Sequence, residues 1–138
     1  MEVQQNAPCN NDTKEVLVVD DSRTHRALVI AALSDYKNFK FVEALDGLDA
    51  LHKIHKLIRL VILDYNMPQM NGLEFLRQIK GYEEFKHIPI IMLTADNDEK
   101  IIKDCYAAGA NIYVTKPLQP KELVKAVEVV RHWYMKET

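Results

Sequence analysis

The sequence is poor in cysteine, with only Cys9 and Cys105 among 138 residues. Neither lies in a C-x-x-C pair or at the spacing of metal ligands, which argues against a structural disulfide or a zinc site. Cys105 falls within a helical pattern, and we expect it to be a small residue that faces the core.

Long apolar runs are also missing, because none approaches the ~20 residues that span a bilayer. The first residues lack the basic and apolar regions of a signal peptide, so we expect a cytoplasmic protein with no membrane partner. The net charge is −2 at pH 7, with both signs mixed along the chain. Nucleic-acid binders usually carry a strongly basic face, so we expect no nucleic-acid partner. No G-x-G-x-x-G follows the first strand pattern, which argues against a dinucleotide-binding Rossmann domain.

Two short apolar runs that end abruptly in carboxylates are the most informative features present. Residues 16–19 lead into Asp20 and Asp21, and residues 60–63 lead into Asp64. Such runs, flanked by helical patterns, predict strands that are buried on both faces of a parallel sheet. Open α/β sheets bind ligands outside the carboxyl ends of their strands. We therefore expect the three carboxylates to lie together at one edge.

Strand and helix patterns alternate five times, which predicts an α/β fold with a five-stranded parallel sheet and helices on both faces. The expected strands are residues 16–20, 39–44, 60–64, 88–94 and 111–115, and the alternating second one is expected at a sheet edge. The expected helices are residues 22–36, 46–57, 71–80, 98–108 and 120–135. Residues 1–14 are polar without periodicity, which predicts a disordered tail before one domain at 15–138.

Helical periodicity also predicts which side chains share a face. The expected apolar positions are Ala27, Leu28, Ala31 and Ala32 in the first helix, Leu48, Leu51, Ile54 and Leu57 in the second, Leu73, Leu76 and Ile79 in the third, and Leu123, Val127, Val130 and Tyr134 in the last. Ser22 is a plausible N-cap, and Gly109 is the residue expected just past a helix C-terminus.

Three carboxylates within a few ångströms repel one another unless a cation lies among them. An all-oxygen set with open positions suits Mg²⁺, which pairs well with phosphate. A carboxylate beside Mg²⁺ can attack phosphorus and become an aspartyl phosphate. This reasoning assigns Asp64 as the nucleophile, with Asp20 and Asp21 as metal ligands and the backbone carbonyl of Asn66 as a further ligand.

Two more of the expected strands end in groups that suit phosphoryl transfer. Thr94 ends the fourth strand pattern and Lys116 follows the fifth. A hydroxyl and an ammonium group at the same edge would neutralise the oxygens of a transferred phosphoryl group.

The motifs that carry this chemistry resemble those of response-regulator receiver domains, in particular the stand-alone, chemotaxis-regulator type of two-component signalling. The matching segments are VVDDS at 18–22, LDYNMP at 63–68, NG at 71–72, IMLTA at 91–95 and YVTKP at 113–117. The resemblance implies a flavodoxin-like, three-layer αβα fold with strand order 2-1-3-4-5 and a cis Lys116–Pro117 bond. It also implies Mg²⁺-dependent phosphorylation of Asp64, with Mn²⁺ as an alternative cation.

The same resemblance implies partners and a switch. The phosphoryl donor would be the phosphohistidine of a histidine kinase or of a histidine phosphotransfer protein, and the chain would catalyse only its own phosphorylation and dephosphorylation. Thr94 would move toward the phosphoryl group and Tyr113 would swing inward, remodelling the surface of the fourth helix, fifth strand and fifth helix, where a downstream protein binds. The resemblance is compatible with a monomer or a weak dimer.

Other functions share part of this pattern. A phosphorelay intermediate and a phosphate sink would use the same chemistry, whereas a pseudo-receiver would be an interaction module without phosphotransfer. A phosphatase of the haloacid-dehalogenase type also has an aspartate nucleophile, but its acidic pair comes last in the chain. Here Asp20 and Asp21 come first, which argues against that class.

Overall fold

The computed structural model describes residues 13–95 and 97–135. Its strands are β2 (Lys14–Val19), β3 (Phe39–Ala44), β4 (Ile58–Asp64), β5 (Ile90–Thr94) and β6 (Ile112–Thr115). The predicted disordered tail and Cys9 fall on residues 1–12, which lie outside the described part. Lys14, which the sequence pattern assigned to the tail, belongs to strand β2 and pairs with Phe39.

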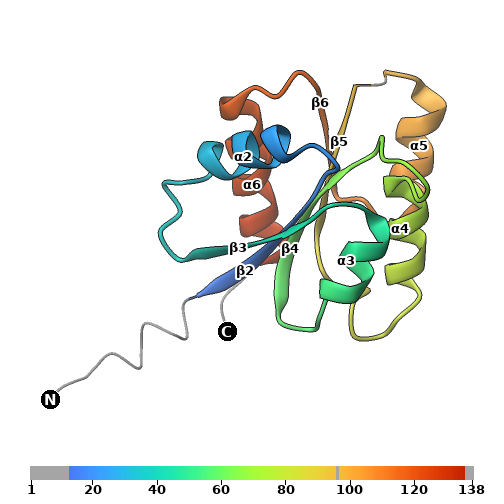
Figure 1. Ribbon diagram of the computed structural model, residues 1–138, viewed down its shortest axis with the longest axis horizontal. Coiled ribbons are helices and arrows are strands. Elements are labelled where there is room, and N and C mark those ends of the chain that lie inside the picture. Colours follow the sequence, from blue (N-terminus) through green and yellow to red (C-terminus); the bar gives the residue numbers. More distant parts are fainter. Residues whose placement is uncertain (1–12, 96, 136–138) are drawn as a thin grey trace, which may run out of the picture.

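The five strands form one sheet in the order β3-β2-β4-β5-β6, and every neighbouring pair is parallel. Numbered along the chain, this is the order 2-1-3-4-5, so the predicted flavodoxin-like topology is confirmed. The second strand lies at an edge, as its alternating pattern predicted (Figure 1). Between the parallel strands, the helices cross over the two faces of the sheet.

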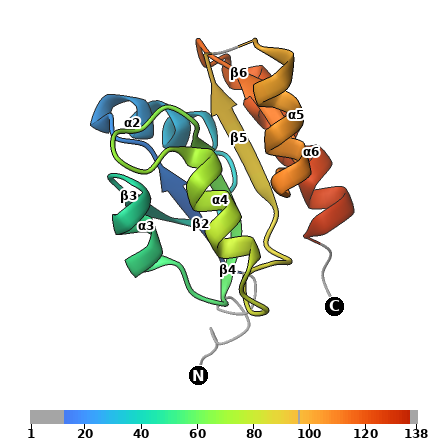
Figure 2. The ribbon, with the colours of Figure 1, turned by 90° about the vertical axis from the view of Figure 1, so that its right-hand side faces the viewer.

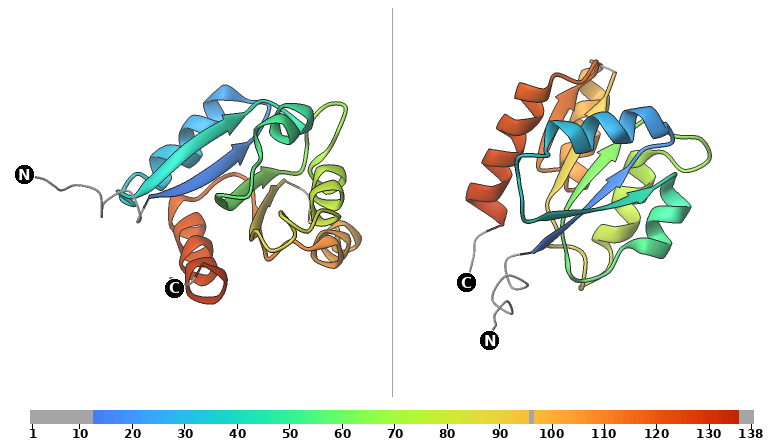
Figure 3. Two further views of the ribbon diagram at one scale, coloured as in Figure 1. Left: turned by 90° about the horizontal axis from the view of Figure 1, so that it is seen from below. Right: turned by 60° about the vertical axis from the view of Figure 1, so that its left-hand side comes forward.

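The helices are α2 (Arg23–Ala32), α3 (Gly47–Lys53), α4 (Gly72–Lys80), α5 (Glu99–Ala108) and α6 (Pro120–Tyr134). Helices α2 and α6 cover one face of the sheet, while α3, α4 and α5 cover the other (Figures 2 and 3). Each face has its own apolar core. No helix within the described residues is both long and apolar enough to cross a bilayer.

Strand β2 contributes side chains to both cores, because its residues alternate between the two faces of the sheet. Val16 and Val18 pack into the core beneath α2 and α6, whereas Leu17 and Val19 pack into the core beneath α3, α4 and α5. All four are at most 1% exposed. Successive strand residues point to opposite faces, so a continuous apolar run is what a strand covered on both sides requires. This burial holds the end of the strand, where Asp20 follows, in a fixed place.

Local signals set several helix ends. The Ser22 side chain accepts a hydrogen bond from the His25 backbone N–H and starts α2, as predicted. Asn71 and Glu74 form a reciprocal capping box at the start of α4. Gly109 ends α5 with φ of 117°, a left-handed conformation that favours glycine. Cys105 is fully buried, as expected.

The predicted apolar face of the first helix is wrong except at Ala32, which packs against the core. Leu28 is 52% exposed, and the buried residues of α2 are Arg26 and Val29. A charged side chain is thus turned toward the sheet, and Arg26 pairs there with Glu43. The helix also ends at Ala32, short of the predicted residue 36.

Two further predictions of buried side chains are corrected. In α3 the buried residues are Gly47 and Ala50, while Leu48 is 48% exposed. A Cβ on Gly47 would lie 2.8 Å from the Met70 sulfur, so this helix packs through its small residues. It ends at Lys53, and Leu57 therefore lies in the following turn, 63% exposed.

The last helix differs from the prediction at its end. Leu123, Val127 and Val130 are buried as predicted, but Tyr134 is 52% exposed. The backbone leaves the helical conformation at Met135, which is 4% exposed and takes the final buried position instead.

Candidate metal centre at the carboxyl edge of the sheet

The three predicted carboxylates lie together. Strands β2 and β4 are neighbours, with Val19 opposite Leu63, so the residues that follow these two positions emerge side by side. One oxygen from each of Asp20, Asp21 and Asp64 can be chosen so that all three lie within 4.8 Å of one another. Asp20 and Asp64 are buried and Asp21 is exposed, which leaves the cluster open to solvent on one side.

The buried carboxyl of Asp64 is held in an environment that disfavours its charge. Burial raises its pKa, and the neighbouring charge of Asp20 raises it further. The hydrogen bond from Lys116 acts in the opposite direction. A divalent cation among these oxygens would favour the charged form in the same way, but more strongly.

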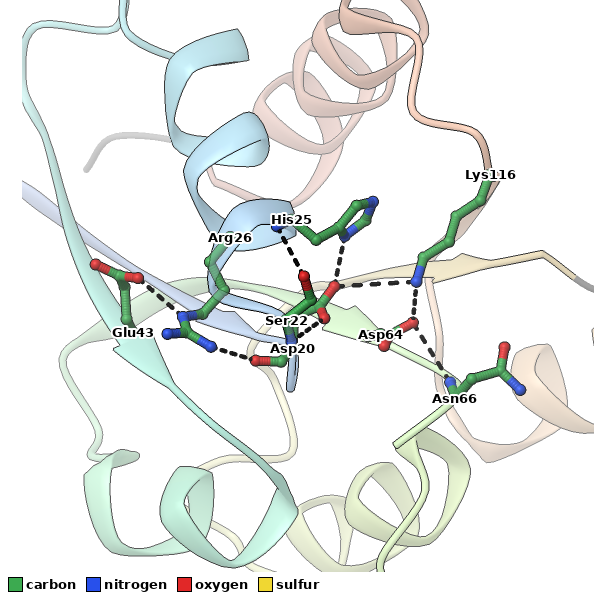
Figure 4. Close-up of polar contacts among 8 residues, drawn as sticks. All are labelled: Asp20, Ser22, His25, Arg26, Glu43, Asp64, Asn66 and Lys116. Atoms are coloured by element: carbon green, nitrogen blue, oxygen red, sulfur yellow. Dashed lines mark hydrogen bonds and ion pairs between the residues drawn. The ribbon is translucent and has the colours of Figure 1, made fainter. Parts of the chain in front are cut away.

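Lys116 is the positive group of the site. Its Nζ lies 2.7 Å from Asp64 Oδ1 and 3.9 Å from Asp20 Oδ2 (Figure 4). The Lys116 backbone N–H donates to the Thr94 carbonyl, which ties the end of β6 to the end of β5. The peptide bond to Pro117 is cis, as the resemblance implied.

Thr94, Tyr113 and Asn66 lie on the strands and loop that the sequence pattern predicted for them. Thr94 ends β5 and is fully buried, one strand away from Asp64. Tyr113 lies half-buried in β6, opposite Met92 of β5. Asn66 is exposed, and its backbone N–H points to Asp64 Oδ1 at 3.4 Å, a long contact (Figure 4).

Two residues at the site were missed by the sequence analysis. His25 Nδ1 lies 2.5 Å from Asp20 Oδ2, and Arg26 donates from Nη1 to the Asp20 carbonyl at 2.7 Å (Figure 4). The signal that could have found them is the short separation in sequence between Asp20 and the predicted N-cap at Ser22. A helix that starts there brings its first turn back over the end of the strand.

The donor set suits a hard divalent cation. Three carboxylates from two adjacent strands supply only oxygen, and one of them faces solvent, where water ligands can complete the coordination. Mg²⁺ keeps several waters and is usually bound through one or two carboxylates together with phosphate oxygens. The residues therefore fit the cation that the sequence motifs implied.

Comparisons with known proteins agree with this geometry. The family model of the response regulator receiver domain matches residues 16–128. Chemotaxis protein CheY1 of Helicobacter pylori is 36% identical over 118 residues, which cover 84% of this chain and 95% of that protein. The chain therefore belongs to the response regulator receiver domain family of two-component signalling.

Solved structures show the same fold. Chemotaxis protein CheY4 of Vibrio cholerae is similar with a TM-score of 0.79 and 34% identity, covering 86% of this chain and 98% of that one. The Mn²⁺-bound form of response regulator Rcp1 is similar with a TM-score of 0.72 and 28% identity, covering 91% of this chain and 96% of that one. The chain thus spans nearly the whole length of these relatives.

Proposed function

We propose that this protein is a phosphoacceptor response regulator that takes a phosphoryl group on Asp64 in the presence of Mg²⁺. The observation that carries the proposal is the position of Asp64, whose buried carboxylate lies between an acidic neighbour and an ammonium group. A structural ion pair would need neither Asp20 nor Asp21 beside it. In phosphoryl transfer, a metal ion and a further positive group neutralise the charge on the phosphoryl oxygens.

The chain's own residues account for the steps of transfer. An oxygen of Asp64 attacks the phosphorus of a phosphohistidine, the O–P bond forms, the N–P bond breaks, and the leaving imidazole takes up a proton from solvent. Lys116 leaves its contact with the carboxylate oxygen and pairs with a phosphoryl oxygen. When bound, Mg²⁺ supplies charge neutralisation on the side of Asp20 and Asp21. The products are an aspartyl phosphate and a neutral histidine.

Self-dephosphorylation follows from the same geometry. Water attacks the phosphorus of the aspartyl phosphate, the O–P bond to Asp64 breaks, and inorganic phosphate leaves. Asp21 is exposed, so the site is open to water on that side. Asn66, also exposed, lies on the loop that follows Asp64.

The readout would use the surface formed by α5, β6 and α6. Thr94 at the end of β5 would follow the phosphoryl group, and Tyr113 lies on the neighbouring strand. A change in charge at Asp64 would favour one of two arrangements of this pair. A downstream protein that binds only one arrangement would then sense the phosphoryl group.

The relatives support this proposal by analogy. CheY1 and CheY4 are named as chemotaxis proteins, and Rcp1 has been solved with Mn²⁺. We propose by extension that a histidine kinase or a histidine phosphotransfer protein donates the phosphoryl group in the cytoplasm, and that the chain acts as a monomer or weak dimer. Mn²⁺ would substitute for Mg²⁺.

The test is phosphorylation by a small-molecule phosphodonor with Mg²⁺, followed by intact-mass measurement. The wild-type chain should gain a single phosphoryl group, whereas Asp64→Asn should gain none. Asp35→Asn is the matched control, because Asp35 is an exposed aspartate in the turn after α2. Equal phosphorylation of the wild type and D64N, or none of the wild type, would reject the proposal in favour of a pseudo-receiver or a different acceptor.

A further inference from the structure

Asp20 is held through both oxygens of its carboxylate and through its backbone carbonyl. Its Oδ1 accepts the backbone N–H of Ser22 at 2.9 Å, and its Oδ2 lies 2.5 Å from Nδ1 of His25. Its backbone carbonyl accepts from the buried guanidinium of Arg26. Only 2% of Asp20 is exposed, so solvent contributes little to holding it.

The main chain fixes the place of His25. Helix α2 starts at Arg23, and the Ser22 hydroxyl oxygen accepts the His25 backbone N–H at 3.1 Å. The ring then reaches back over the end of β2, where Figure 4 shows Nδ1 facing Asp20. A single cap therefore fixes both the helix and the ring that contacts the carboxylate.

We propose that His25 is a positioning residue, which presets the Asp20 carboxylate for the divalent cation. The inference rests on the cation site in the proposed function and adds a residue to it. Two facing lone pairs would repel, so the nitrogen that faces Asp20 carries the proton and donates it. The carboxylate is then held from both oxygens, by a backbone N–H on one side and by the imidazole N–H on the other.

This arrangement leaves room for the cation. Each carboxylate oxygen has two lone-pair positions, and the contacts from Ser22 and His25 use one on each. The remaining positions can bind a cation while both hydrogen bonds persist. Partners that orient a metal-binding side chain typically change metal affinity about 10- to 100-fold when they are removed.

Arg26 holds the backbone of Asp20, by donating to its carbonyl. Its Nε donates to Glu43 Oε1 at 2.9 Å, so the guanidinium bridges strand β3 and the carbonyl of Asp20. Arg26 fixes the backbone, whereas His25 fixes the side chain. Only the side-chain contact can be removed without disturbing the edge of the sheet, which makes His25 the residue to test.

If His25 instead competed with the cation, its removal would change the Mg²⁺ affinity in the opposite direction. A histidine that merely occupied the place of the cation would compete with it, and its removal would tighten Mg²⁺ binding. A positioning histidine loses affinity on removal and regains it when another N–H donor replaces the ring. Mg²⁺ affinity therefore separates the two roles without any measurement of phosphorylation.

The experiment is calorimetric titration of the full chain with Mg²⁺ at a single, mildly alkaline pH. His25→Leu removes the donor, and His25→Phe is a second donor-free variant that keeps a ring. His25→Asn keeps an N–H near the position of Nδ1. His52→Leu is the matched control, since His52 is exposed on α3. Thermal unfolding without cation checks that each variant is folded.

We expect Mg²⁺ to bind the donor-free variants about 10-fold more weakly than the wild type. H25N should recover most of that loss, and H52L should bind like the wild type. Unchanged or tighter binding by the donor-free variants, or equal weakening in H25N, would overturn the inference. Phosphorylation of the wild type on Asp64 is measured separately from Mg²⁺ affinity. The proposed function can therefore stand if this inference fails, and a failure of phosphorylation is distinguished from a failure of this inference.

Discussion

Lys116 donates a hydrogen bond to Asp64 across 52 positions of sequence, at 2.7 Å. The two residues come from β4 and from the end of β6, which β5 separates in the sheet. This contact holds a positive charge against the carboxylate that the proposed chemistry would use. A cation at Asp20 and Asp21 and the ammonium of Lys116 would then both act on the same group.

Replacing Lys116 by Met should change cation binding and phosphorylation in opposite directions. Removing a positive charge near two carboxylates removes repulsion for Mg²⁺, so Mg²⁺ should bind at least about fivefold more tightly. Loss of the group that neutralises a phosphoryl oxygen should slow phosphorylation by a small-molecule donor about 100-fold. Calorimetry and a phosphorylation time course measure the two effects. A variant that loses Mg²⁺ affinity along with rate would show that the lysine only holds the fold of the site.

Gly72 should be intolerant of a side chain. A Cβ at this position would lie 2.5 Å from the Asp64 carbonyl oxygen, which is backbone and cannot move easily. Gly72→Ala should therefore lower the free energy of unfolding by about 1–3 kcal/mol, measured by urea denaturation. Gly81→Ala is the control, because its nearest contact would be an ordinary 3.4 Å and its φ is −80°. Similar stability of the two variants would contradict this close approach of α4 to β4.

Because of Lys80, the free energy of unfolding should change with pH in the alkaline range. Burial lowers its pKa from 10.5 to about 8, and its Nζ donates to the carbonyls of Lys86 and Ile88. Between these two pKa values the unfolded chain holds a proton that the folded chain has released, so the free energy of unfolding rises with pH. A neutral amine still donates to both carbonyls.

The measurement is urea denaturation of the wild type and Lys80→Met from pH 8 to pH 10. The wild type should gain stability relative to K80M across this range, and exposed Lys103→Met should behave like the wild type. A constant difference between the wild type and K80M would show that Lys80 keeps its charge in the fold.

Tyr113 should matter for the readout and not for the chemistry. It lies half-buried in β6 and is not one of the three clustered carboxylates. Tyr113→Ala should be phosphorylated at close to the wild-type rate but should bind a downstream protein more weakly. The measurement compares affinity for the target between the phosphorylated wild type and the phosphorylated variant. Unchanged affinity would remove Tyr113 from the switch.

The sequence predicted the sheet well because its signals are local and strong. Apolar runs such as 16–19 and 60–63 are short, uninterrupted and rich in branched residues, and they are buried at 0–1% exposure. Parallel pairing then follows from the alternation with helices. The three carboxylates could be placed together because the ends of parallel strands share one edge.

Helix faces were predicted unevenly. Leu73, Leu76 and Ile79 of α4 are buried as predicted, but in α2 and α3 small or charged residues took several of the buried positions. Gly47 and Ala50 cover the core in α3, and Arg26 does so in α2. Periodicity places apolar side chains inward, so Leu48 and Leu28 were assigned to the core although each is about half exposed. The rotation of each helix depends instead on its cap and on a partner such as Glu43, which is distant in sequence.

The site itself was predicted in part. Asp20, Asp21, Asp64 and Lys116 are brought together as expected. His25 was missed although Asp20 lies only two residues before the predicted N-cap at Ser22, because its contact with Asp20 depends on how tightly the chain turns into α2. Knowledge of that turn requires three-dimensional structure.

A crystal structure of the protein with Mg²⁺ and beryllium trifluoride, which mimics a phosphoryl group, tests the central claim most directly. The account predicts a beryllium–oxygen bond to Asp64, Mg²⁺ contacting Asp20, Asp21 and Asp64, and Lys116 moved from the carboxylate to a fluorine. Beryllium trifluoride bound elsewhere, or Mg²⁺ absent from the three carboxylates, would contradict it.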